Sequence, residues 1–304
     1  MKKGLQISFS WLFAIIVGGV ILFLAFFASS KIITQEQYTV DTTTAKQLGI
    51  LTNPLEMGFE SAEKNTISLP SNTRMFNSCE NQGTFGKQQI SFSQKSFGKW
   101  SEPGSKVSFE NKYFFSNSNI SSKMLILFSK PFEFPFKVTD LVIIIPLEES
   151  YCFVDSPSEV KGDVSNLGLE NVEFENCSKG SQRVCFSKGS GCEQIVDYKT
   201  NSILKGQERI YFSGDGLMYA GIFSEKEIYE CQVQRLMKRV EALSKIYQDK
   251  ESLLVGKCNS NLGSSLELLK SQAEGLKSSQ DLLSIEKTAN SIRDLNGGAI
   301  CRLW

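Results

Sequence analysis

The sequence predicts an α+β protein that is held to a membrane by an N-terminal transmembrane helix. An apolar run without charge occupies Trp11–Ala28, short β-type segments fill Ile67–Phe223, and helical spacing begins at Ser224. These patterns divide the chain into an anchor at 1–31, a stalk or linker at 32–66, a β-rich domain with disulfides at 67–223, and a C-terminal helical hairpin or three-helix bundle at 224–304.

The apolar run is long enough to cross a membrane. Its eighteen residues carry no polar side chain, and as a helix they would span about 27 Å, close to the roughly 30 Å of bilayer hydrocarbon. Lys2 and Lys3 precede the run, which favours a cytoplasmic N-terminus and an extracytoplasmic location for the rest of the chain. We therefore expect a single-pass protein of the cell membrane whose N-terminal helix contacts lipid.

A cleaved secretory signal is an alternative to this retained anchor. Ala28-Ser29-Ser30 is compatible with cleavage after Ser30, although the apolar core is longer than the 7–15 residues usual in such signals. Both readings place most of the chain outside the cytoplasm.

The first ten residues carry a resemblance to a known family. Gln6 and Ser8 follow a short basic leader and precede the apolar helix, as in the class III signal peptide of archaeal type IV pilin-like proteins, whereas Leu5 and Ser10 depart from that pattern. The resemblance implies cleavage near Gly4–Gln6 and a pilin-like component of the cell surface. The whole chain, including FSKPFEFPFKVTDL and the closing CRLW, also resembles uncharacterised single-pass surface proteins of archaea, which implies a setting but no activity.

Composition limits the chemistry. The chain has no histidine, which excludes Ser-His-Asp and Cys-His catalysis and disfavours a zinc site. Its 33 basic and 33 acidic residues balance, so nucleic acid is not an expected partner. An even number of cysteines outside the cytoplasm predicts disulfides, and the candidates are Cys79, Cys152, Cys177, Cys185, Cys192, Cys231, Cys258 and Cys301. Asn119 and Asn176 lie in sequons and are candidate glycosylation sites.

The sequence of the segment after the anchor is compatible with two structures, a helical stalk and a linker, and favours neither. Lys31–Leu51 either continues the membrane helix as a stalk or forms a linker, and the threonines at 42–44 weaken helix propensity. Asn53-Pro54 ends any helix there.

Strand patterns follow from Ile67 onward. Gln89–Ser93 alternates with period two, while Leu141–Ile145 is a continuous apolar run that predicts the buried centre of a sheet. Cys177–Cys192 is rich in Gly and Ser, so we expect a disulfide-stapled hairpin or loop. Further strands are predicted at Lys106–Phe109, Met124–Phe128, Tyr151–Val154, Arg183–Phe186, Arg209–Phe212 and Met218–Phe223.

Helical spacing dominates after Ser224, which with Glu227 forms a capping-box pattern. The apolar seam is Tyr229, Val233, Leu236, Val240, Leu243 and Tyr247, backed by Met237 and Ile246, and two further stripes follow at 262–276 and 282–295. A break between Gly275 and Ser279 would turn the chain back, because Gly is unfavourable inside a helix. That turn would bring Cys301 toward Cys258, and we predict a disulfide between them.

Motifs for chemistry are scarce, and no catalytic, cofactor-binding or metal residue is predicted. Ser213–Gly216 fits a turn, Glu148-Glu149 a solvated loop, and Glu170, Glu173 and Glu175 an exposed strand face. The basic cluster Arg235, Lys238 and Arg239 fits an exposed helix face, or a site for an acidic partner.

These observations predict a non-enzymatic, membrane-anchored extracytoplasmic protein of structural or binding type, with a pilin-like surface component as its more specific form. Its protein partner is unknown, or is a second copy of the chain. The alternative is an extracytoplasmic hydrolase that uses carboxylates.

Overall fold

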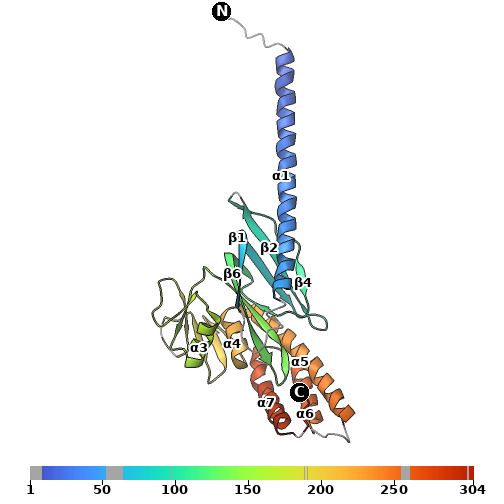
Figure 1. Ribbon diagram of the computed structural model, residues 1–304, viewed down its shortest axis with the longest axis vertical. Coiled ribbons are helices and arrows are strands. Elements are labelled where there is room, and N and C mark those ends of the chain that lie inside the picture. The colour runs from blue at the N-terminus through green and yellow to red at the C-terminus, as the bar shows by residue number, and fades with distance from the viewer. Residues whose placement is uncertain are drawn as a thin grey trace, which may run out of the picture.

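The computed structural model describes residues 9–52, 64–96, 98–187, 189, 191–254, 261–299 and 301–304, with backbone alone at 33, 34, 36, 37 and 51. In these ranges the protein is α+β, with an N-terminal apolar helix, two sheets and three disulfides whose partners are both described. Figure 1 shows the first helix projecting far beyond the folded body. The helices are α1 (Phe9–Leu51), α3 (Ser158–Leu167), α4 (Gly214–Ile222), α5 (Lys226–Leu254), α6 (Gly263–Glu274), the 3-10 helix η1 (Ser279–Asp281) and α7 (Leu282–Gly298).

The first sheet has seven strands within the described residues. Its order is β3-β2-β1-β6-β7-β5, with β4 on β2, and only β5 and β7 pair in parallel. The strands are β1 (Lys64–Glu80), β2 (Lys87–Ser96), β3 (Lys99–Trp100), β4 (Val107–Phe109), β5 (Phe114–Phe115), β6 (Asn119–Glu133) and β7 (Lys137–Pro146).

Both faces of this sheet are covered at β6 and β7. Leu127 and its cross-strand partner Ile144 belong to the core that α1 covers, whereas Phe128 and its partner Ile143 belong to the core that includes α4 and α5. Successive side chains of a strand point to opposite faces. The run Leu141–Ile145 is therefore apolar throughout because neither face meets water.

The second sheet has six strands in the described part of the chain, in the order β13-β12-β11-β10-β8-β9. Strand β8 is followed by α3 and then by the parallel strand β9, a βαβ unit. The strands are β8 (Tyr151–Val154), β9 (Val172–Phe174), β10 (Gln182–Cys185), β11 (Gln194–Asp197), β12 (Ser202–Lys205) and β13 (Glu208–Tyr211).

The segment predicted as a strand at Met218–Phe223 is wrong, because it lies in α4 and the residue after it. Every residue of α4 from Gly216 to Ile222 is buried, so the helix has no polar face and no amphipathic period to reveal it. The capping box predicted at Ser224 is also wrong. The Ser224 hydroxyl donates to the Ala220 carbonyl oxygen at 2.6 Å, and α5 begins only at Lys226.

The C-terminal helices follow much of the predicted spacing. Tyr229, Val233, Leu236 and Val240 of α5 are buried, and α6 lies against α5. The interruption near Gly275 is present, since α6 ends at Glu274 and η1 begins at Ser279. Two apolar side chains assigned to these stripes are instead exposed, Ile246 by 58% and Leu295 by 50%.

Helix α1 continues without interruption through the first part of the predicted stalk, as far as Leu51. Its threonines are accommodated because the hydroxyls of Thr42, Thr43 and Thr44 donate to the carbonyl oxygens of Tyr38, Thr39 and Val40, one turn earlier. Of the two structures expected for Lys31–Leu51, the helix is therefore the one present.

Candidate functional site

The first half of α1 carries an apolar surface that nothing in the described chain covers. The span Phe9–Ile32 has 24 residues and is long and apolar enough to cross a membrane. Phe23 is 68% exposed and Phe26 is 74% exposed. A helix of this length extends about 36 Å, more than the hydrocarbon thickness of a bilayer. The chemistry of the surface suits lipid tails or other apolar helices.

The second half of α1 docks on the first sheet through one face. Asp41, Ala45, Leu48 and Thr52 are buried, and their spacing of four, three and four residues places them on a single stripe of a helix. Ala45 and Leu48 pack in the core that contains Phe92 of β2. The helix thus has a bare half, Phe9–Ile32, and a docked half around Asp41–Thr52. Because the docked half packs on the sheet, the body fixes the direction in which the bare half points.

Polar contacts hold the end of this junction that lies nearest the apolar half of α1. The Ser101 hydroxyl donates to an Asp41 carboxylate oxygen at 2.9 Å, and the backbone N–H of Ser105 donates to the Thr42 hydroxyl at 3.0 Å. Burial raises the pKa of Asp41, against the opposing effect of the Ser101 hydrogen bond. Gly104 permits the close approach, because a Cβ there would lie 2.8 Å from the Thr42 backbone nitrogen.

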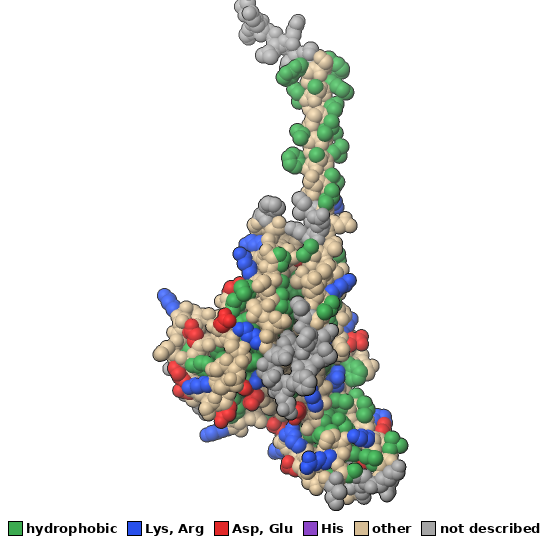
Figure 2. All heavy atoms as spheres, in the orientation of Figure 1, with side chains coloured by type: hydrophobic (Ala, Val, Ile, Leu, Met, Phe, Trp, Pro, Cys, Tyr) green, Lys and Arg blue, Asp and Glu red, His purple; other side chains and the backbone are tan. Residues whose placement is uncertain are grey.

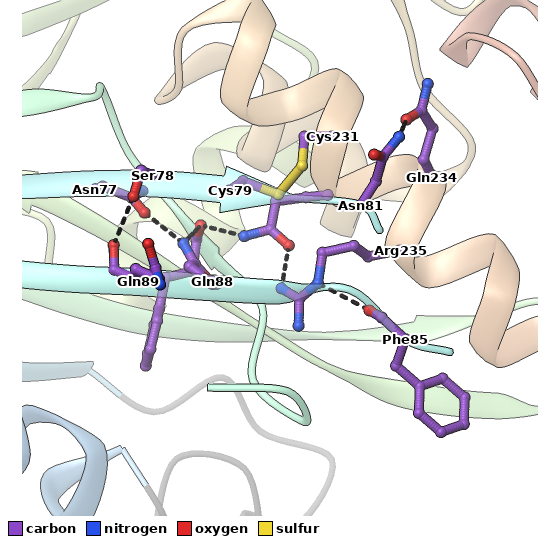
Figure 3. Close-up of a disulfide and its surroundings, with 12 residues drawn as sticks. Asn77, Ser78, Cys79, Asn81, Phe85, Gln88, Gln89, Cys231, Gln234 and Arg235 are labelled. Atoms are coloured by element: carbon purple, nitrogen blue, oxygen red, sulfur yellow. Dashed lines mark hydrogen bonds between the residues drawn. A yellow bond between two sulfur atoms is a disulfide. The ribbon is translucent and has the colours of Figure 1, made fainter. Parts of the chain in front are cut away.

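The disulfide Cys79–Cys231 joins the end of β1 to α5 across the body, and Figure 3 shows it beside Arg235. Arg235 is fully buried, so the exposed face predicted for it is wrong. Its five N–H groups donate to the carbonyl oxygens of Phe85, Phe109, Glu110 and Lys112 and to the Gln232 side-chain oxygen.

Arg235 also lies over the Tyr113 ring, 4.7 Å from its centroid. Burial lowers the pKa of Arg235, but the five acceptors compensate for the lost water. Its neighbour Lys238 donates to the backbone oxygens of Asn81 and Gly83. These two members of the basic cluster therefore join α5 to the turn between β1 and β2.

A hollow of about 1120 Å³ lies over the outer side of the second sheet. Ile195, Leu204 and Arg209 form a cross-strand row across β11, β12 and β13, and Tyr198 and Phe186 stack at one end. The loop stapled by Cys185–Cys192 borders it. The hollow has aromatic, apolar and cationic groups, which is a composition suited to binding.

Three acidic residues, Glu159, Asp163 and Asp215, which we define as the acidic cluster, are near enough to Tyr198 of this hollow that their charges, after burial, raise its pKa. Lys130 pairs with Asp163 at 2.7 Å, and the Tyr219 hydroxyl donates to the same oxygen at 3.4 Å. Desolvation raises the pKa of Asp215, and the negative charge of Asp163 raises it further.

The predicted cysteines are all oxidised where the structure describes them. Besides Cys79–Cys231, the bonds are Cys152–Cys177 and Cys185–Cys192. Cys301 is disulfide-bonded as well, and its predicted partner Cys258 lies outside the described residues. Asn119 and Asn176 are exposed, which leaves both glycosylation candidates as predictions.

The other acidic residues singled out in the sequence are engaged locally. Hydrogen bonds from Ser122 and Lys123 outweigh burial and lower the pKa of Glu148, while Tyr151 donates to Glu149. Glu170 pairs with Lys64, Glu175 pairs with Lys161, and Glu173 accepts from Ser178. Among the described residues, no three Cys, Asp or Glu side chains are grouped to hold a metal ion.

The junction at Asp41 is the feature that sequence reasoning missed. The four-three-four spacing of its buried stripe was a readable signal, but it was hidden in a segment dominated by polar residues. The acidic cluster had no comparable signal, because Asp163 and Asp215 are far apart in the chain.

No protein-family model, no curated protein and no solved structure matches this chain.

Proposed function

We propose that this chain is a membrane-anchored extracytoplasmic protein of structural or binding type, and more specifically a pilin-like surface component. The observation that carries the proposal is the continuity of α1. Its bare half, Phe9–Ile32, and its docked half around Asp41–Thr52 belong to one uninterrupted helix.

A bare apolar helix of this size is unstable in water. At about 25 cal/mol per Å² of apolar surface, its exposed phenylalanine, leucine and isoleucine side chains favour transfer to lipid or to neighbouring helices. The docked half then holds the body at a defined place relative to that apolar environment. This division of one helix suits a subunit that is first anchored in a membrane and then assembled through the same apolar surface.

The disulfides support an extracytoplasmic body. Three are described, and one of them, Cys79–Cys231, links residues 152 positions apart. Such bonds persist in oxidising compartments and are rare in the cytoplasm. With Lys2 and Lys3 ahead of the helix, this supports an orientation with the N-terminus inside.

The test uses the full chain in membranes. Protease added to intact right-side-out vesicles should digest the body and leave an α1 fragment, and the protein should resist alkaline extraction. The mass of the mature N-terminus separates a retained anchor from cleavage near Gly4–Gln6 or after Ser30. Cross-linking between α1 helices in the membrane would support the pilin-like form. A body protected from protease, or a protein released by alkali, would overturn the proposal.

A hydrolase that uses carboxylates is the second candidate, and the acidic cluster favours it. A general acid needs a carboxyl group whose pKa is raised, beside a second group that stays ionised. Burial and the negative charge of Asp163 raise the pKa of Asp215, and Lys130 pairs with Asp163. Hydrolysis of an extracellular glycan by the wild type that is lost in Asp215→Asn and in Asp163→Asn, with folding retained, would support an enzyme.

A further inference from the structure

The hairpin formed by β2 and β3 extends along α1 toward its apolar half. Ser96 pairs with Lys99, and Lys95 pairs with Trp100. Figure 1 shows β1 and β2 rising beside α1 toward the end that leaves the body. The hairpin therefore belongs to the side of the body that would face the membrane.

The position of the hairpin along α1 follows from two contacts. Gly49 of α1 lies against Phe109, which pairs with Gln88 at the start of β2. Further up the helix, Asp41 is bonded to Ser101, whose backbone N–H donates to Gln94 near the end of β2. Strand β2 thus advances toward the apolar half of α1.

The distance that remains to the membrane is short. Asp41 follows Ile32, the last residue of the apolar span, by nine positions, which is about 13 Å along a helix. The hairpin continues beyond Gln94 by two described residue pairs, Lys95–Trp100 and Ser96–Lys99. They advance by about 7 Å along the strand, which leaves less than about 10 Å, measured along α1, to the end of that span. The headgroup layer of a bilayer is roughly 5–8 Å thick on each side. The long side chains of Lys95 and Lys99 can cover the difference.

The chemistry of the hairpin fits that layer. Lys95 and Lys99 are exposed, and the Arg74 guanidinium lies 4.2 Å from the centroid of the Trp100 ring. The Lys95 ammonium lies 5.8 Å from the same centroid. Lysine and arginine beside an indole ring are typical of segments that bind at a membrane surface.

The local charge is positive although the whole chain is neutral. Lys31, at the end of the apolar span, is a further exposed cation, and Glu102, two residues after Trp100, is an exposed acid. In Figure 2, Lys and Arg side chains are visible on the part of the body nearest the apolar helix, and most acidic side chains on this face lie farther from it.

We propose that this hairpin, through Lys95, Lys99 and Trp100 and together with Arg74 of the neighbouring strand β1, binds the anionic phosphate headgroups of the same membrane that holds α1. The inference rests on the proposed anchoring of α1. The hairpin is a second point of attachment beside the helix, and two points fix the tilt and rotation of the body over the membrane.

Lysine acylation in the full-length protein tests this. The protein is reconstituted into vesicles of phosphatidylcholine alone or of an equal mixture with phosphatidylglycerol, and flotation is measured first. A water-soluble amine-reactive ester is then added, and modification of each lysine is followed by mass spectrometry. We expect Lys95 and Lys99 to react several-fold more slowly with phosphatidylglycerol present. Lys287, exposed on α7 at the opposite end of the body, should react equally in both and serves as the internal control.

The two proposals fail in different ways. Flotation with equal reaction rates at Lys95 and Lys99 in both vesicles would overturn the hairpin proposal and leave the anchor intact. No flotation would overturn both. In the paired variant Lys95→Glu/Lys99→Glu, anionic lipid should still slow the acylation of Lys31 in part. The same variant should lose the photo-cross-link between phosphatidylglycerol and Trp100 that the wild type forms. Lys245→Glu/Lys287→Glu is the matched control and should keep that cross-link; its loss there too would count against the hairpin.

Discussion

Ser101 and Asp41 join the first sheet to the docked half of α1 through one hydrogen bond of 2.9 Å to a buried carboxylate. Because burial raises the pKa of Asp41 above its ordinary value of 3.8, the folded state holds the proton more tightly than the unfolded state. This carboxylate therefore weakens docking at neutral pH, and the penalty disappears as pH falls through the folded pKa toward 3.8.

Asp41→Asn should remove this pH dependence. At pH 7 the variant should be as stable as the wild type or more stable, because the amide needs no desolvation of a charge. Below pH 4 the difference should shrink, since the wild-type carboxyl is then neutral. Urea unfolding of both proteins in the same detergent between pH 3.5 and pH 7 measures the difference. A wild type that gains stability over Asp41→Asn as pH rises would contradict the assignment.

Gly104 and Gly162 should respond to alanine with opposite signs. A Cβ at Gly104 would lie 2.8 Å from the Thr42 backbone nitrogen and 2.9 Å from Asp41 Cβ, so Gly104→Ala should destabilise docking by about 1–3 kcal/mol. Gly162 lies in α3 with open space around its Cβ position, and Gly162→Ala should stabilise by about 0.5–1 kcal/mol. Thermal unfolding of the two variants checks both signs. A stabilising Gly104→Ala would mean that α1 does not approach this closely.

Arg235→Met should be among the most damaging single substitutions. It leaves the carbonyl oxygens of Phe85, Phe109, Glu110 and Lys112 and the Gln232 oxygen without their donors. A loss of about 3–5 kcal/mol is typical of breaking such a buried charged network. The Arg235 side chain also lies close to the Gly86 backbone, since a Cβ there would be 3.0 Å from Arg235 Cγ.

Lys238→Met is the matched control for Arg235→Met. Lys238 belongs to the same basic cluster but is only partly buried, so its loss should cost about 1 kcal/mol or less. Equal losses of unfolding free energy in the two variants, measured in urea, would show that the Arg235 hydrogen bonds stabilise the fold no more than those of Lys238.

The contrast between these two residues shows where sequence reasoning stops. The seam of α5 was predictable, because Tyr229, Val233 and Leu236 repeat with helical spacing and are buried. Arg235 lies beside that seam, and charge alone favours an exposed position. Its burial depends on four backbone oxygens from two distant segments, one at Phe85 and one at 109–112, which no local pattern encodes.

The sequence analysis did not predict helices α3 and α4, and the reason differs between the two. In α3, Val160, Val164 and Leu167 are buried with helical spacing, and Gly168 ends the helix in the left-handed conformation, so the signal was present in SEVKGDVSNLG. In α4 the signal was absent, since a helix buried on all sides has the same apolar run as a central strand. The bare half of α1 was predictable from composition, whereas the acidic cluster depends on the tertiary fold.

Removing the disulfides one at a time should rank them by loop length. Cys79–Cys231 spans 152 positions, Cys152–Cys177 spans 25 and Cys185–Cys192 spans 7. On the chain-entropy model, the stabilisation is roughly 5, 3.5 and 2.5 kcal/mol respectively. The paired serine variants should therefore lose stability in that order, measured by urea unfolding without reductant.

Combining the loss of Cys79–Cys231 with the loss of Arg235 tests whether this disulfide also positions α5. If the bond only restricts the unfolded chain, the paired variant Cys79→Ser/Cys231→Ser should keep the native contacts of Arg235, and the extra loss in Arg235→Met should be unchanged in that background. If the bond also positions α5 against β1, the two losses should not add, because Arg235 is one helical turn from Cys231 and donates to the Phe85 carbonyl oxygen. The adjacency of the bond and the guanidinium favours non-additivity, and a double-mutant cycle measures it directly.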